Sequence, residues 1–164
     1  MTLAELEQTA VAHGARAAEK LRQDGSVAHA VMVFAHTNRF KDTPQYSGGR
    51  LAPLVTPTQD SRAINAAAVA GVRDLYRPGY LYNKAGVMLM DLSPAGVHQG
   101  DLFARGDCDR SRRLMATVDQ MNRDMGRGAV FFAGQGIKQR WRMQANMKSP
   151  AYTTAWHSLA RVIA

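Results

Sequence analysis

The chain has 164 residues and a formal charge of +8, from 21 Lys and Arg against 13 Asp and Glu. Since 46% of the residues are apolar and 21% are charged, the chain can bury a core, which excludes disorder over most of its length. No apolar run approaches the roughly 20 residues of a membrane helix, and Glu5 and Glu7 stand where a secretion signal would be basic. The single cysteine, Cys108, excludes an internal disulfide and a multi-cysteine zinc site. We therefore expect an unexported cytoplasmic protein of one or two small domains.

Most of the excess positive charge lies in the last third of the sequence. Residues 1–103 hold ten basic and nine acidic side chains, whereas residues 104–164 hold eleven basic and four acidic ones. Such a field attracts polyanions, but it does not distinguish DNA from RNA or from an acidic membrane surface. A solvated basic face is the ordinary alternative.

Two helices are predicted in the first part of the chain. Thr2 and Glu5 form a capping-box pattern, and apolar residues then recur at helical spacing until Asp24-Gly25. A second helix starts at a cap provided by Thr58 or Asp60 and ends at Pro78-Gly79. Its apolar face contains Ile64, Ala68, Gly71, Val72 and Leu75.

Three strands accompany these helices. Residues 27–37 are rich in β-branched and aromatic side chains and indicate a largely buried strand. Residues 50–56, interrupted by Pro53, indicate a short edge strand, and residues 80–92 a long one. The order helix, strand, strand, helix, strand predicts an α+β fold in which two helices cover one face of a mostly antiparallel sheet.

A linker and a second unit follow this first domain of residues 1–92. Residues 93–109 form the linker by their composition, and residues 110–164 form a small α/β tail. The tail starts with a third helix and continues with a short strand over residues 129–133 and a tight turn at Gly134-Gln135-Gly136. The apolar face of the third helix is predicted to contain Leu114, Val118, Met121 and Met125.

Catalytic constellations are scarce in this sequence. The five histidines lack metal-ligand spacing, and Asp107 and Asp109 disfavour a thiolate on Cys108 between them. The acidic residues are single side chains rather than a converging set that holds divalent ions. We expect no catalytic residue, no metal site and no cofactor.

One short motif stands out in the linker. Gln99-Gly100-Asp101-Leu102-Phe103 places an amide, an acid and two neighbouring large apolar side chains in a polar segment. Leu102 and Phe103 can fill a hydrophobic cleft on a partner while Gln99 forms a hydrogen bond at its rim. Alternatively, the two apolar side chains fold back onto the sheet as a local plug.

Four blocks of the sequence resemble the C-terminal third of the UmuC family of translesion DNA polymerases, in the same order and across essentially the whole chain. They are Thr56-Pro57-Thr58-Gln59-Asp60-Ser61-Arg62, Tyr82-Asn83-Lys84-Ala85-Gly86-Val87-Met88-Leu89, Gly126-Arg127-Gly128 with Phe132-Ala133-Gly134-Gln135-Gly136-Ile137, and Ser149-Pro150-Ala151-Tyr152-Thr153-Thr154. In that family the first unit is a little-finger domain that grips duplex DNA, and the second is a family-specific tail. The resemblance also implies a bacterial cytoplasmic protein associated with the nucleoid and a role in the SOS response to DNA damage.

The resemblance assigns partners to particular residues. Gln99, Asp101, Leu102 and Phe103 fall where the family binds the β sliding clamp, with Gly100 in place of the usual Leu. A UmuD-type subunit and a RecA-type filament are further partners that the family uses. Backbone contacts to DNA, without sequence readout, are expected from Arg39, Lys41, Arg50, Arg62 and Lys84. A basic and aromatic patch of the tail, for single-stranded DNA or for protein docking, contains Arg127, Lys138, Arg140, Trp141, Arg142 and Lys148.

The same resemblance indicates what the chain lacks. The family carries its catalytic palm, with the magnesium-binding carboxylates, ahead of this region, so we expect a chain that cannot extend a primer alone. The little finger also opens with a strand that precedes the first helix here, and a sheet without it predicts strand exchange between copies. The alternative is a free-standing, non-enzymatic module that binds the clamp, the filament or the UmuD-type subunit.

Overall fold

The computed structural model describes residues 1–96, 106–139, 141–142 and 147–159. Three α-helices and three strands form the described core, followed by two single turns of 3-10 helix. In chain order these are α1 (Leu3–Asp24), β1 (Ser26–Thr37), β2 (Ser47–Thr58), α2 (Ser61–Leu75), β3 (Tyr82–Pro94), α3 (Asp109–Asp124), η1 (Ala133–Gln135) and η2 (Trp156–Ser158).

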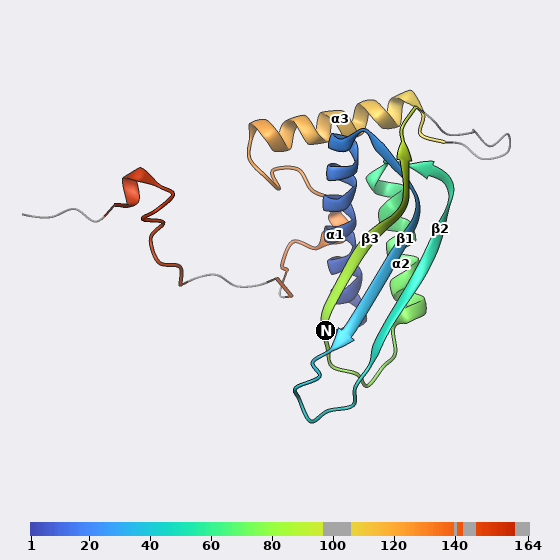
Figure 1. The fold of residues 1–164 in the computed structure, drawn as a ribbon, viewed down its shortest axis with the longest axis vertical. Coiled ribbons are helices and arrows are strands. Elements are labelled where there is room, and N and C mark those ends of the chain that lie inside the picture. Colours follow the sequence, from blue (N-terminus) through green and yellow to red (C-terminus); the bar gives the residue numbers. More distant parts are fainter. Residues whose placement is uncertain (97–105, 140, 143–146, 160–164) are drawn as a thin grey trace, which may run out of the picture.

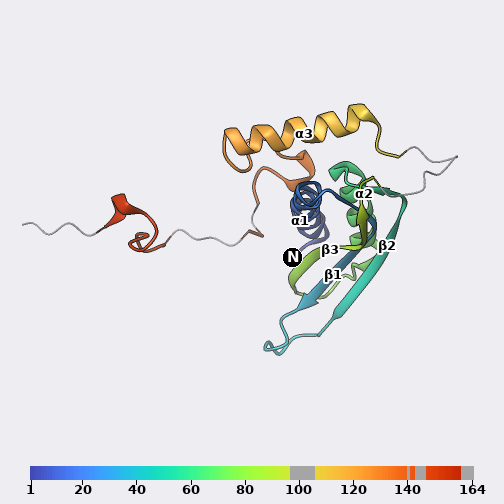
Figure 2. The same cartoon turned by 45° about the horizontal axis from the view of Figure 1, so that its top comes forward.

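The molecule is a two-layer sandwich in which α1 and α2 cover one face of the sheet (Figures 1 and 2). Apolar side chains of both helices and of the central strand meet between the layers, and Leu6, Val31 and Ile64 are at most 1% exposed. The predicted α+β fold is confirmed. Among the described residues, no helix combines the length and the apolarity needed to cross a membrane.

The predicted ends of α1 and the start of α2 are confirmed. The Thr2 side chain accepts a hydrogen bond from the backbone N–H of Glu5, and the Glu5 carboxylate accepts one from the N–H of Thr2. Gly25 adopts a left-handed conformation, with φ of 72°, and ends α1. Of the two candidate caps for α2, Asp60 is the N-cap, because its side chain accepts from the backbone N–H of Arg62 in the first turn; the Thr58 hydroxyl accepts from the N–H of Asp60 itself.

The sheet has the order β2-β1-β3, and both pairings are antiparallel. β1 is therefore central and buried, as predicted, and β2 is an edge strand that runs longer than the predicted residues 50–56. An irregularity in register separates the pair Ala30 and Pro53 from the pair Ala28 and Thr58, which accommodates the two prolines of β2. Strand exchange at a sheet edge stays a prediction.

Two predictions for the tail are wrong. Residues 129–133 do not form a strand, because the side chain of Asn122 accepts from the N–H groups of Gly128 and Val130 and donates to the Val130 carbonyl. In α3 the buried residues are Ser111 and Met115, whereas members of the predicted apolar face are at least 40% exposed, namely Leu114, Met121 and Met125. The predicted turn at 134–136 is confirmed as η1 with Gly136 after it.

Candidate nucleic-acid interface

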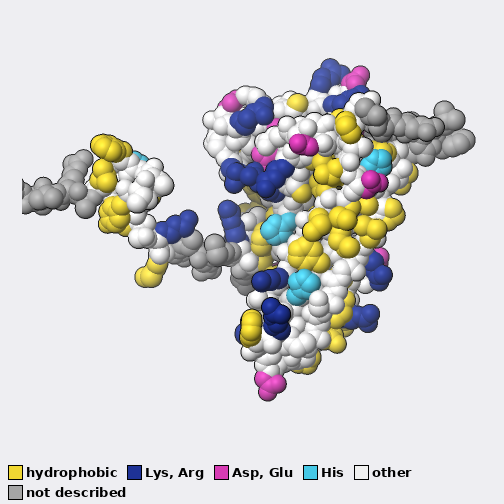
Figure 3. Space-filling model, in the orientation of Figure 1, with side chains coloured by type: hydrophobic (Ala, Val, Ile, Leu, Met, Phe, Trp, Pro, Cys, Tyr) yellow, Lys and Arg dark blue, Asp and Glu magenta, His cyan; other side chains and the backbone are white. Residues whose placement is uncertain are grey.

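The face of the sheet that the helices leave open carries a ladder of apolar side chains. Met32 on the central strand has Leu51 on one side and Met88 on the other, and these two flanking side chains are 52% and 53% exposed. Phe34 lies between Gly49 and Gly86, and a Cβ on Gly86 would overlap its ring. Figure 3 shows hydrophobic side chains gathered over the strands, with Lys, Arg and His around them.

The loop between β1 and β2 carries two of the predicted DNA contacts, Arg39 and Lys41. Both side chains are exposed. The loop is internally hydrogen-bonded, because the Gln45 side-chain amide donates to the carbonyl groups of Asn38, Lys41 and Thr43 at 3.2, 2.9 and 2.8 Å. These cations therefore project from an ordered turn.

Tyrosines anchor the base of this loop. The hydroxyl of Tyr46 donates to the carbonyl of Leu75 at 3.1 Å, and its ring packs against Tyr80 and Tyr82 with centroids 5.2 and 5.8 Å away. Tyr82 is 4% exposed, and this burial raises the pKa of its hydroxyl. The loop is thus fixed to the end of α2 and to the start of β3.

Lys84 joins the loop cations at this end of the sheet, whereas Arg50 lies on the other face. Lys84 is the cross-strand partner of His36, one residue before β1 ends, on the open face with Met32 and Phe34. Arg50 pairs with Val33, which is 1% exposed against the helix layer. Its side chain therefore leaves the edge strand toward the helices.

Arg62 lies at the opposite end of the sheet and is engaged with protein groups. Residue 62 follows β2, whose Thr58 pairs with Ala28 at the start of β1, roughly 25 Å along the strand from His36. Its guanidinium pairs with Asp60 at 2.6 Å and donates to the Ser111 hydroxyl at 3.1 Å. The hydrogen bond and charge of Asp60 raise the pKa of Arg62.

The tail is held to the sandwich by α3, which crosses the end of α1 (Figure 1). Arg22 on α1 donates two hydrogen bonds to Asp119 on α3, both 2.7 Å long, and the two side chains are 11% and 12% exposed. Asp107 accepts from the Thr58 hydroxyl at 2.5 Å and from the Gln59 backbone N–H at 3.0 Å. These contacts join residues predicted as linker and tail to residues predicted as the first domain.

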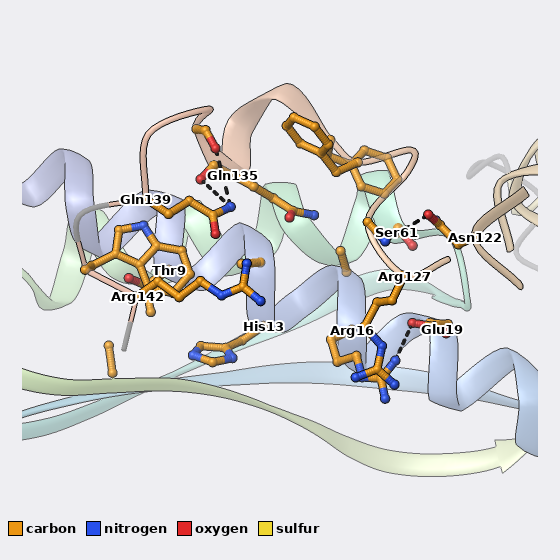
Figure 4. A pocket seen from close by; sticks show the side chains of 18 of the residues that line it. Thr9, His13, Arg16, Glu19, Ser61, Asn122, Arg127, Gln135, Gln139 and Arg142 are labelled. Atoms are coloured by element: carbon orange, nitrogen blue, oxygen red, sulfur yellow. Dashed lines mark hydrogen bonds and ion pairs between the residues drawn. The ribbon is translucent and has the colours of Figure 1, made fainter. Parts of the chain in front are cut away.

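Part of the predicted tail patch faces a cleft of about 950 Å³ that is bounded by α1, by residues 83–85 at the start of β3 and by described tail residues of 127–139 and 141–142. In Figure 4, His13 and Arg16 from α1 and Arg127 and Arg142 from the tail point into the same space. Trp141 lies against His13, with ring centroids 6.2 Å apart, and desolvation lowers the pKa of that histidine. The structure thus brings together three members of the patch, Arg127, Trp141 and Arg142.

Other members of the patch are separated from this cleft or not described. Lys138 does not line it, and Lys148 belongs to the segment that lies apart from the sandwich in Figures 1 and 2. Arg140 and the whole motif Gln99 to Phe103 fall outside the described residues. Within the described ranges, no three side chains of His, Cys, Asp or Glu gather closely enough to hold a metal ion.

Sequence reasoning missed two residues of this interface. Phe40 in the loop is 88% exposed beside Arg39 and Lys41, and His36 stacks on Phe34 with ring centroids 5.4 Å apart. The signal for Phe40 was its place between two cations in a polar loop. His36 could be found only from the register of β1 and β3, since this pairing puts it beside Lys84.

These features define an α+β module with cations at one end of an open sheet face and a second segment docked on its helices. The impB/mucB/samB family C-terminal domain matches residues 1–102, and a domain of unknown function (DUF4113) matches residues 112–162. The chain therefore belongs to the impB/mucB/samB family.

Curated relatives agree with this assignment. Protein UmuC of Salmonella typhimurium (strain LT2) is 41% identical over 160 residues, which cover 96% of this chain and 38% of the relative. Protein MucB of Escherichia coli is 42% identical over 161 residues, or 96% and 37% of the two chains, and Protein ImpB of Salmonella typhimurium is 41% identical over 156 residues, or 94% and 37%. The chain spans less than two fifths of the length of these relatives. No solved structure is significantly similar to it.

Proposed function

We propose that this chain is the DNA-gripping and clamp-tethering C-terminal region of an error-prone translesion DNA polymerase in bacterial DNA-damage tolerance. Its membership of the impB/mucB/samB family supports this proposal. The observation that carries it is the cluster of Arg39, Lys41 and Lys84 at one end of the open sheet face. On this proposal, catalysis belongs to a palm that is not among these residues.

The grip acts on phosphates rather than on base edges. Lys and Arg side chains on an ordered loop and on β3 hold the backbone by charge, which gives affinity without sequence readout. Arg50 reaches the same DNA only if the duplex also contacts the edge strand, because its side chain leaves toward the helix layer. Arg62 binds protein groups rather than DNA in this structure: it donates hydrogen bonds to Asp60 and to Ser111 on α3, and so contributes to the docking of α3.

Replacing the three clustered cations is expected to flatten the salt dependence of DNA binding. Each phosphate contact contributes about 0.9 to the slope of log K against log salt on duplex DNA. The triple variant Arg39→Gln/Lys41→Gln/Lys84→Gln should therefore lose about 0.9 in slope for each cation that contacts a phosphate. Fluorescence anisotropy with unrelated duplex sequences measures the slope, and its value should not depend on the sequence.

Lys20→Gln is the matched control for this experiment, since Lys20 is an exposed cation on α1, away from the open face of the sheet. It should leave the slope within error of wild type. An equal loss in the control and in the triple variant, or no salt dependence in the wild type, would refute the proposed grip.

Clamp tethering is the second part of the proposal, and the motif Gln99 to Phe103 supports it. Immobilised β sliding clamp is expected to retain the wild-type chain and to lose the variant Leu102→Ala/Phe103→Ala, because the two apolar side chains supply the anchor. The control is Val55→Ala/Leu92→Ala, which removes two apolar side chains that are 84% and 53% exposed on the sheet. Equal retention of both double variants would exclude the motif as the anchor.

The alternative, a free-standing module that binds the clamp, a RecA-type filament or a UmuD-type subunit, is favoured by the exposed side of α3. Leu114, Met121 and Met125 are 44%, 40% and 70% exposed there, with basic residues on the same helix. Exposed apolar side chains with charged neighbours are typical of protein docking surfaces. Retained partner binding without any binding of DNA would favour this second function.

A further inference from the structure

The tip of the loop between β1 and β2 presents an aromatic ring to solvent. Phe40 is 88% exposed, the highest value among the exposed large apolar side chains of the described residues 1–96. Its neighbours in sequence are the exposed cations Arg39 and Lys41, and the Arg39 guanidinium lies 5.4 Å from the centroid of the ring. Asp42 is the acidic residue next along the loop.

The exposure of Phe40 is built into the loop. The backbone N–H of Phe40 donates to the side-chain carbonyl of Asn38 at 3.1 Å, and the N–H of Lys41 donates to the Asn38 backbone carbonyl at 3.1 Å. Together with the three bonds from Gln45, these contacts fix the turn on either side of the ring. The phenyl group is therefore held outward by a hydrogen-bonded turn, and its binding surface is ordered in advance.

An exposed aromatic ring between two cations matches the chemistry of a nucleotide. Single-stranded nucleic acids are held by basic side chains on the phosphates and by aromatic side chains on which the bases stack. Phe40 has no hydrogen-bonding group and cannot read the edge of a base, so its contact tolerates any sequence. If Phe40 instead bound an apolar pocket on a partner protein, the flanking cations Arg39 and Lys41 would have no role in the contact.

An unpaired base suits this ring better than a paired one. To reach a base inside a duplex, Phe40 would have to separate stacked base pairs, whereas an unpaired base offers a free face. The proposed function places duplex DNA at the same end of the sheet, where Lys84 and the loop cations gather. A base next to the end of a bound duplex therefore lies within reach of the loop tip.

We propose that Phe40 is a stacking site for an unpaired nucleobase, with Arg39 and Lys41 on the adjoining phosphates. This inference rests on the proposed DNA-binding function and adds a preference for junctions between duplex and single strand. The preference resides in one side chain, and the electrostatic grip on duplex DNA does not depend on it.

The test compares two probes, a blunt duplex and the same duplex with a single-stranded overhang that carries 2-aminopurine. Phe40→Ala should weaken binding to the overhang probe about tenfold and binding to the blunt duplex less than twofold, and it should abolish the wild-type change in 2-aminopurine fluorescence. The salt slope should equal that of wild type, because no charge is removed. Phe40→Tyr should retain binding and fluorescence change, whereas Phe40→Leu should not.

Val55→Ala is the matched control, since Val55 is an apolar side chain 84% exposed on β2, toward the end of that strand away from the loop. Thermal melting checks that each variant is folded, which is expected because Phe40 contributes little to the core. If Phe40→Ala binds the overhang probe as tightly as wild type, or if Phe40→Leu rescues it, the stacking site is wrong while the salt-dependent grip stands. If the wild type binds neither probe, the proposed function fails and this inference with it.

Discussion

Replacing Asp119 by alanine is expected to lower the free energy of unfolding by about 3 kcal/mol and to release α3 from α1. Asp119 accepts both hydrogen bonds of the Arg22 fork at 2.7 Å, and the pair is nearly buried, with side chains 12% and 11% exposed. Without the carboxylate, a guanidinium remains in a poorly hydrated site. Its remaining acceptors, the Gln59 carbonyl and the Ser61 hydroxyl, carry no charge.

Urea denaturation gives the change in unfolding free energy, and hydrogen exchange of the α3 amides shows whether the helix has detached. The matched control is Asp109→Ala on the same helix, where the ion pair with Arg112 is exposed, since the Asp109 and Arg112 side chains are 81% and 54% accessible. Such a pair contributes at most about 1 kcal/mol. If Asp119→Ala is no more destabilised than Asp109→Ala, the Arg22 pair does not hold the tail.

The sandwich was predictable because its determinants are local. The capping pattern at Thr2 and Glu5, the left-handed Gly25 and the apolar spacing of α2 all act within a few residues of where they stand. The β-branched residues of β1 likewise identify a buried strand without reference to its partners. The length of β2 was underestimated, because its pairing with β1 continues across Pro53, and α2 ends at Leu75, before the predicted Pro78-Gly79.

The tail was harder to predict because distant contacts decide it. Leu114 and Met121 are spaced as suitably for a buried face as Ser111 and Met115. The face that docks is selected by Arg22, 97 residues from Asp119, and by Asp60, 51 residues from Ser111. No local periodicity contains that information. The apolar residues 129–133 likewise do not indicate that the side chain of Asn122 forms hydrogen bonds with the backbone of Gly128 and Val130.

The candidate interface was predictable in part for the same reason. Arg39 and Lys41 were correctly placed in the loop after the first strand, because a polar stretch follows an apolar one there. The strand register decides the faces of the other two cations. The pairing of β1 with β3 puts Lys84 beside His36 on the open face, and the pairing of β1 with β2 puts Arg50 on the face toward the helices. Arg62 looked equivalent to the others until its contacts with Asp60 and Ser111 placed it in the joint between α2 and α3.

Asp60 is expected to make the contact between α2 and α3 less stable at acidic pH. Burial alone would raise the pKa of its carboxyl, but hydrogen bonds from the side chains of Arg62 and Ser111 and from the Arg62 backbone outweigh that effect, so the pKa lies below its ordinary value. The folded state therefore holds the ionised form at a pH where the unfolded chain binds a proton. This contribution is fully present above about pH 5 and is lost as the pH falls through the lowered pKa.

Two substitutions separate the charge of Asp60 from its role as a cap. Asp60→Ala should lose about 3 kcal/mol at pH 7, because α2 loses its cap while the buried Ser111 hydroxyl loses its acceptor. Asp60→Asn keeps a good cap and should lose about 1 to 2 kcal/mol through the charged acceptor alone. The exposed Arg62 accounts for little of either value, since its side chain is 55% accessible.

Denaturation in urea from pH 7 to pH 3 measures both losses. The stability of Asp60→Asn should approach that of wild type as the acid protonates the wild-type carboxyl, whereas Asp60→Ala should remain the less stable because its cap is absent at every pH. A difference between wild type and Asp60→Asn that stays constant down to pH 3 would mean that the carboxylate charge does not stabilise the joint. Asp60, Arg62 and Ser111 would then act there through shape and neutral hydrogen bonds, and the docking of α3 would depend chiefly on Arg22 and Asp119.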